Sequence, residues 1–144
     1  LRSTQHLVDD DLQAMATFLR SLPPRERPPQ RGEPAAANTL AAGRQLYERH
    51  CQDCHGKSGE GAAGAYAALA GHRVVTMDSP ANLVRVIVTG GFAPATAGHP
   101  RPYGMPPFGH VLSDAEIAAL ASWLRRAWGH EAPAVGPLLV QALR

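Results

Sequence analysis

The chain is short of cysteine and of charge of either sign, and each shortage excludes a class of protein. Two cysteines in 144 residues cannot form the dense disulfide framework of a small secreted domain. A formal net charge of +2 gives no basic surface for nucleic acid. Apolar residues make up 44% of the chain and charged residues 18%, which is typical of a folded protein and not of a disordered one.

Long apolar runs and aromatic residues are scarce as well. No stretch approaches the roughly 20 apolar residues that cross a bilayer, and residues 1–4 open a polar segment instead of a signal peptide. Aromatic residues amount to 6%, so the core has few large side chains.

The two cysteines that are present lie three positions apart, in Cys51-Gln52-Asp53-Cys54-His55. Each thiol can add to one vinyl group of a haem, and the histidine that follows can bind the iron, so this spacing predicts c-type haem attachment. A structural zinc site would need about four protein ligands. A dithiol oxidoreductase would need a βαβ context, so both alternatives are disfavoured.

A helix is predicted over residues 9–22, with Asp9, Asp10 and Asp11 as its cap and first turn. Its apolar side chains recur at helical spacing and form one face: Leu12, Met15, Phe18, Leu19 and Leu22. Residues 23–34 hold five prolines and several charges and are predicted to be a semi-rigid linker.

Three further helices are predicted after the linker. One runs from near Asn38 to the cysteines, one covers 81–88 behind a Ser79-Pro80 cap, and one opens at a Ser113-x-x-Glu116 capping box and ends at Gly129. Long glycine- and proline-rich loops separate them, and no segment alternates as a strand does. The predicted fold class is all-α.

Three methionines are candidates for the second axial ligand. Met15 is expected in the core and Met77 in packing, whereas Met105 lies in a rigid loop of Gly and Pro that can hold its sulfur over a haem. Met105 is therefore the predicted ligand, and His99 is the one credible rival. Of the other histidines, His72 is expected to bond a haem propionate or face water, and His6, His50 and His130 are expected near the surface.

Residues 38–131 resemble the class I cytochrome c domain. The motifs that carry the resemblance follow one another in a fixed order: Gly43-x-x-x-Tyr47, Cys51-x-x-Cys54-His55-Gly56, Gly90-Gly91, Met105-Pro106-Pro107-Phe108, Leu112-Ser113-Asp114 and Trp128-Gly129. The resemblance is greatest to the last haem domain of the cytochrome subunits of membrane-bound alcohol, sugar and sugar-acid dehydrogenases. It implies one covalently bound haem c, with the iron held by His55 and Met105.

The same resemblance implies further contacts with the haem. Leu69 and Pro106 would lie beside it, and Arg85 and Tyr103 would donate to its propionates. A backbone carbonyl in Tyr66-Ala67-Ala68-Leu69, where the family usually has Tyr-Pro-Pro-Leu, would accept a hydrogen bond from His55. Gly43 and Tyr47 would pack against Trp123 and Leu120, where two helices cross.

The domain organisation follows from these motifs. Residues 1–22 resemble the closing helix of a preceding cytochrome domain, 23–37 form the linker, 38–131 the haem domain and 132–144 a tail that is expected to pack on it. The missing signal peptide fits a mature chain or a piece of a longer one, because thioethers form outside the bacterial cytoplasm. The implied location is the periplasm, at the outer face of the inner membrane.

The expected function is one-electron transfer without catalysis, since a six-coordinate iron has no open position for a substrate. The expected partners are a dehydrogenase subunit or a neighbouring haem domain as donor, and a quinone or terminal oxidase as acceptor. Two alternatives stay open: a free one-haem shuttle, in which residues 1–22 fold back onto the haem domain, and a haem enzyme or gas sensor with an open iron.

Overall fold

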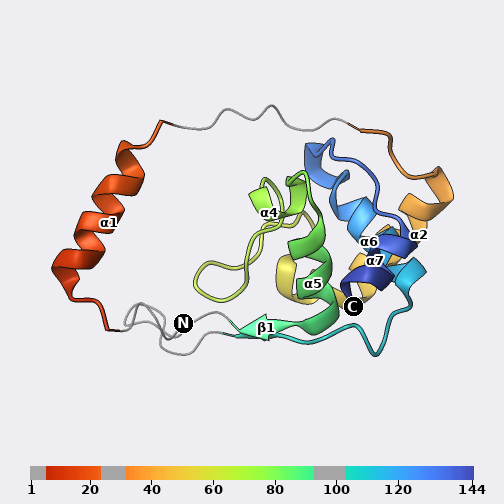
Figure 1. The fold of residues 1–144 in the computed structure, drawn as a ribbon. Helices are drawn as coiled ribbons and strands as arrows, with labels where there is room; N and C mark the ends of the chain where they lie inside the picture. Colours follow the sequence, from red (N-terminus) through yellow and green to blue (C-terminus); the bar gives the residue numbers. More distant parts are fainter. Residues whose placement is uncertain (1–5, 24–31, 93–102) are drawn as a thin grey trace.

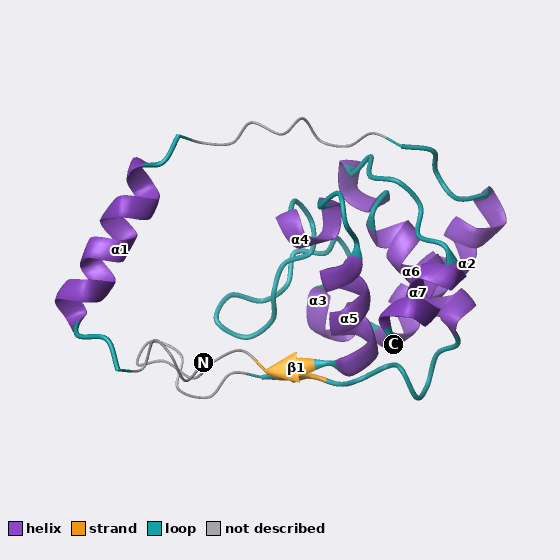
Figure 2. Ribbon diagram, viewed as in Figure 1, coloured by secondary structure: helices purple, strands orange, loops and turns teal. Residues whose placement is uncertain are grey.

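A computed structural model describes residues 6–23, 32–92 and 103–144 of the chain. In these ranges the chain is mostly helical, with one pair of two-residue strands (Figures 1 and 2). The α-helices are α1 (Asp9–Ser21), α2 (Ala37–His50), α3 (Gln52–His55), α4 (Arg73–Thr76), α5 (Ala81–Thr89), α6 (Asp114–Leu124) and α7 (Pro137–Leu143). The strands are β1 (Gly91–Phe92) and β2 (Gly104–Met105), and a 3₁₀ turn, η1, covers Ala127–Gly129. The all-α prediction is confirmed.

Helices α2 and α6 pack closely against each other, on the side of the domain where α7 also lies (Figure 1). A glycine makes this crossing possible, because a Cβ atom at Gly43 would lie 2.7 Å from Trp123 Cβ and closer still to the carbonyl oxygen of Ala119. Four residues along α2, the buried Tyr47 ring packs against Trp123 at a tilt, with 4.8 Å between ring centroids. The packing of Gly43 and Tyr47 against the last long helix agrees with the prediction.

The hydrophobic core joins α6 to α5 and α7. Ile117, Leu120 and Val84 are each at most 1% exposed. The tail helix α7 packs on α6 and buries Val140 completely. The expectation that the tail packs on its own domain is therefore correct, although its helical form was not foreseen.

Helix ends agree with the predictions in part. At the start of α6 the Ser113 side chain caps the Glu116 backbone and Glu116 reaches back to Ser113, which completes the capping box. Helix α6 stops at Leu124, short of the predicted Gly129. The chain turns because Trp128 adopts a left-handed conformation with φ of 53°, which sequence pattern does not signal for such a large residue.

Helix α1 has the predicted bounds to within one residue, but it does not bury its apolar face. Met15 is 48% exposed and Phe18 64%, so the prediction that Met15 is a core residue is wrong. The predicted aspartate cap is also wrong, since Val8 occupies the cap position without a side-chain hydrogen bond. No residue of α1 is buried, and the helix stands apart from the others (Figure 1).

Candidate haem site

The two cysteines and the histidine lie where α2 turns into α3. The turn is held by backbone hydrogen bonds from Cys51 N to Tyr47 O and from His55 N to Cys51 O, both 2.9 Å. This geometry leaves Cys51 buried, Cys54 exposed and His55, which follows them, half-buried. All three residues line a cavity.

Two adjoining cavities, of about 370 and 380 Å³, open beneath this turn. They share part of their lining, including Cys51, His55 and Met105, and together they form one slot between α3 and α5. The walls of the first cavity are mainly aliphatic and come from a loop and the three helices α4, α5 and α6: Leu69, Val74, Val75, Leu83, Ile87, Leu120 and Leu124. Such a slot suits a large, flat, apolar group.

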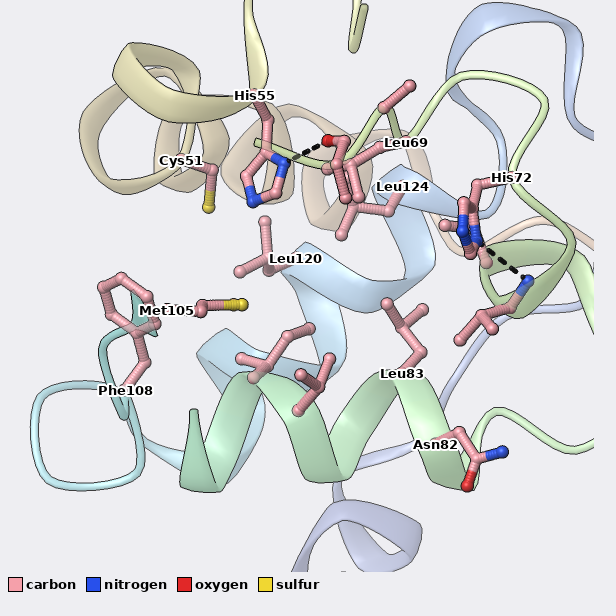
Figure 3. A pocket seen from close by; sticks show the side chains of 16 residues that line it. Cys51, His55, Leu69, His72, Asn82, Leu83, Met105, Phe108, Leu120 and Leu124 are labelled. Carbon is pink, nitrogen blue, oxygen red and sulfur yellow. Dashed lines mark hydrogen bonds between the residues drawn. The ribbon is translucent and has the colours of Figure 1, made fainter. Parts of the chain in front are cut away.

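A hydrogen bond orients the His55 ring. Its Nδ1 lies 2.7 Å from the carbonyl oxygen of Ala67, so Nδ1 carries the proton and Nε2 is left with a free lone pair (Figure 3). The loop that presents this carbonyl is itself fixed, because Gly61 N donates to His55 O at 2.8 Å and Leu69 N donates to Gly59 O at 2.7 Å. The carbonyl contact expected from the family pattern is present, with alanine in place of proline.

Met105 faces His55 from the opposite wall of the slot (Figure 3). Its backbone pairs with Gly91 in the short antiparallel sheet of β1 and β2. Close contact with Gly90, which has φ of 63°, leaves no room for a side chain there. The sheet was not expected from the sequence. The glycines and prolines of the loop predicted that it is rigid, and the sheet adds the backbone pairing that fixes the position of Met105.

The donor set fits a covalently attached haem. Two thiols, an imidazole with a free Nε2 and a thioether converge on one apolar slot, which is the donor set of c-type cytochromes. Burial, and then the charge of Cys54, raise the pKa of Cys51 to about 12. The Cys51 thiol therefore stays protonated at neutral pH, which disfavours a reactive dithiol.

The other predicted cofactor contacts divide into two groups. Leu69 lines the first cavity, and Tyr103 and Pro106 line the second. Arg85 lies on the exposed side of α5 and lines neither cavity. Its contact with a propionate stays a prediction from family resemblance, which the cavity geometry does not support.

Asn82 and Phe108 line the cavities but were missed by the sequence reasoning. Asn82 lies with His72 at the end of the slot far from Cys51 (Figure 3). His72 Nδ1 accepts from Val74 N at 3.2 Å, so its Nε2–H is left as a donor at that end. Asn82 and Val86 are four residues apart on α5 and both line the slot. This helical spacing could have predicted that Asn82 shares the slot-facing side of the helix.

Two histidines lie differently from expectation. His130, expected at the surface, is half-buried and bridges two segments, accepting from Gly71 N at 3.0 Å and donating from Nδ1 to Leu124 O at 2.9 Å. His50 lines the second cavity and contacts the Phe108 ring. The rival ligand His99 lies outside the described residues.

A helical domain with a Cys-x-x-Cys-His turn and a methionine across an apolar slot defines a c-type cytochrome. Residues 38–124 match the family model described as cytochrome c oxidase, cbb3-type, subunit III. The chain belongs to this cytochrome c family. The resemblance and the cytochrome c fold inferred from the sequence are thereby confirmed, and a cytochrome c domain of this kind carries electrons instead of catalysing a reaction.

Several relatives are cytochrome subunits of dehydrogenases. The chain is 39% identical over 142 residues to the alcohol dehydrogenase (quinone) cytochrome c subunit of Gluconacetobacter polyoxogenes, with 91% of this chain and 30% of that protein covered. It is 30% identical to the gluconate 2-dehydrogenase cytochrome c subunit of Pantoea cypripedii, covering 92% and 32%, and 28% identical to the fructose dehydrogenase cytochrome subunit of Gluconobacter japonicus, covering 99% and 34%. The chain thus spans about a third of the length of these relatives.

Proposed function

We propose that this chain transfers single electrons through one covalently bound haem c whose iron is held by His55 and Met105. The observation that carries the proposal is that the two side chains face each other across the slot beside Cys51 (Figure 3). The thiols of Cys51 and Cys54 would each add across a vinyl group, sulfur to one carbon and the thiol proton to the other. The bound haem supplies a metal that gains or loses one electron.

The protein holds the two axial ligands in fixed positions and excludes water from the slot. Ala67 O holds the His55 ring, the β1–β2 pair holds Met105, and the aliphatic walls exclude water. Because the two ligands are held in place, their geometry would change little when the iron gains or loses an electron. A small change in geometry favours fast electron transfer. The exposed side chains of Cys54, Phe92 and Tyr103 at the second cavity mark the side where a redox partner would approach.

We place the haem domain in a dehydrogenase cytochrome subunit. Electrons would come from a dehydrogenase catalytic subunit or a neighbouring haem domain and pass to a quinone or a terminal oxidase. The relatives' names and the partial coverage of their length support this assignment. The periplasm, at the outer face of the inner membrane, is the matching location. No helix in the described parts of the chain has the length and apolar character to cross a membrane.

We further propose that α1 is the last helix of a preceding domain, joined through residues 23–37 to the haem domain at 38–131, with 132–144 as its tail. The exposed apolar side chains of α1 support this reading over a free shuttle, in which they would be covered by the haem domain. Phe18→Ser should leave the unfolding of this chain unchanged within about 0.5 kcal/mol. In a longer natural chain it should lower stability, and an unchanged longer chain would contradict the proposal.

The haem proposal is tested by the optical spectrum. The oxidised protein should show the weak far-red band of a sulfur-to-iron bond, and the reduced protein should not bind carbon monoxide. A high-spin oxidised spectrum with ready carbon monoxide binding would favour the alternative of an open-iron enzyme or sensor. One-electron titration with a redox mediator should fit a single centre.

A further inference from the structure

Arg125 is a buried cation just beyond the end of α6. It is 1% exposed, and its guanidinium reaches backbone carbonyls of two other segments. Nη1 donates to Val75 O at 3.0 Å and to Met77 O at 2.8 Å, and Nε donates to Pro133 O at 2.8 Å. One side chain thus joins the end of α6 to the end of α4, including Met77 just after it, and to the C-terminal segment.

The acceptors of these hydrogen bonds are neutral backbone carbonyls, and moving a charge out of water into a protein interior is costly. Burial lowers the pKa of Arg125, and the charge of Asp78, whose side chain is exposed, acts in the opposite direction. A guanidinium stays charged at any ordinary pH all the same. The fold therefore holds a fixed positive charge in an apolar interior.

This charge lies directly behind a wall of the proposed haem slot. Val75, whose carbonyl accepts from Arg125, lines the first cavity with its side chain, and so does Leu124, the residue before Arg125. His72 and Asn82, at the end of the slot far from Cys51, flank the segment that Arg125 holds. A low-dielectric wall screens a charge far less than water does.

We propose that Arg125 raises the reduction potential of the haem by fixing a positive charge behind the slot. The proposal rests on the proposed haem function. An electron delivered by the redox partner lowers the charge of the haem by one unit. A nearby fixed cation stabilises this reduced form more than the oxidised form, so Arg125 biases the site toward accepting electrons.

The test compares three variants in the haem-loaded protein at a fixed mediator potential. Arg125→Gln removes the positive charge but keeps a side chain that can donate hydrogen bonds. Arg125→Lys keeps the charge but loses the planar guanidinium with its several N–H donors. Arg126→Gln removes the charge of the neighbouring, half-buried arginine. We expect Arg125→Gln to lower the ratio of reduced to oxidised haem about fivefold or more. Arg125→Lys and Arg126→Gln should change the ratio less than about twofold.

A folded Arg125→Gln protein with an unchanged ratio would overturn the proposal, and so would an equal loss in Arg125→Lys, because the effect would then be one of shape and not of charge. If Arg125→Gln does not take up haem, Asp78→Asn decides at low ionic strength. Removing that opposing charge should raise the ratio, and an unchanged or lower ratio contradicts the proposal. The far-red sulfur-to-iron band of the wild-type protein tests the haem function separately.

Discussion

The Nδ1 atom of His55 lies 2.7 Å from the carbonyl oxygen of Ala67. This bond links the proposed proximal ligand to a loop in which alanine stands where the family usually has proline. A hydrogen bond to the second nitrogen makes a ligating imidazole a stronger donor, and it thereby stabilises the oxidised metal. The stiffness of the loop at Ala67 is therefore expected to affect the reduction potential.

Ala67→Gly should loosen this loop and raise the potential. Added backbone freedom weakens the bond from His55, so the imidazole becomes a poorer donor to oxidised iron. We expect a rise within about 60 mV, the equivalent of a tenfold change for one electron. Ala63→Gly, at an exposed position of the same loop, is the matched control and should leave the potential unchanged. A fall in the potential of Ala67→Gly would contradict the role given to the carbonyl.

Met105→Ala should open the iron on the side opposite His55. The reduced variant should bind carbon monoxide, and the potential should fall by on the order of 0.1 V, because the thioether raises it. Met77→Ala is the control, since Met77 does not line either cavity. If Met105→Ala keeps the wild-type spectrum and Met77→Ala changes it, the ligand assignment is wrong.

Gly43→Ala should destabilise the domain through the crossing of α2 and α6. The added methyl group would overlap the backbone of Ala119 and the side chain of Trp123. Overpacking of this kind costs about 1–3 kcal/mol of unfolding free energy. Gly136→Ala, where a Cβ atom meets nothing within 4 Å, should change it far less. Equal unfolding midpoints of the two variants in denaturant would refute the close crossing.

Local sequence signals predicted the elements that depend on nearby residues. The Ser113 capping box and the glycine at the α2–α6 crossing were recognised, since each has a short-range or family pattern. The ligand turn at Cys51–His55 follows from a motif of five residues.

Features that depend on distant partners could not be predicted. The apolar spacing of Met15 and its neighbours indicated an amphipathic helix, but spacing does not say what covers the face. Arginine is a residue type usually found at the surface, but Arg125 is buried because its side chain donates hydrogen bonds to carbonyls about 50 positions away. His130 is fixed in the same way by Gly71, 59 positions away.

The central claim is that Cys51 and Cys54 hold a haem covalently, and the mass of the unfolded protein tests it most directly. The protein is produced in cells that attach c-type haem and is then denatured in acid, which removes a haem held only by its iron ligands. We predict a mass equal to the chain plus one haem, and loss of the stable double attachment in Cys51→Ser and Cys54→Ser. The mass of the bare chain, with two thiols free to react, would contradict the claim.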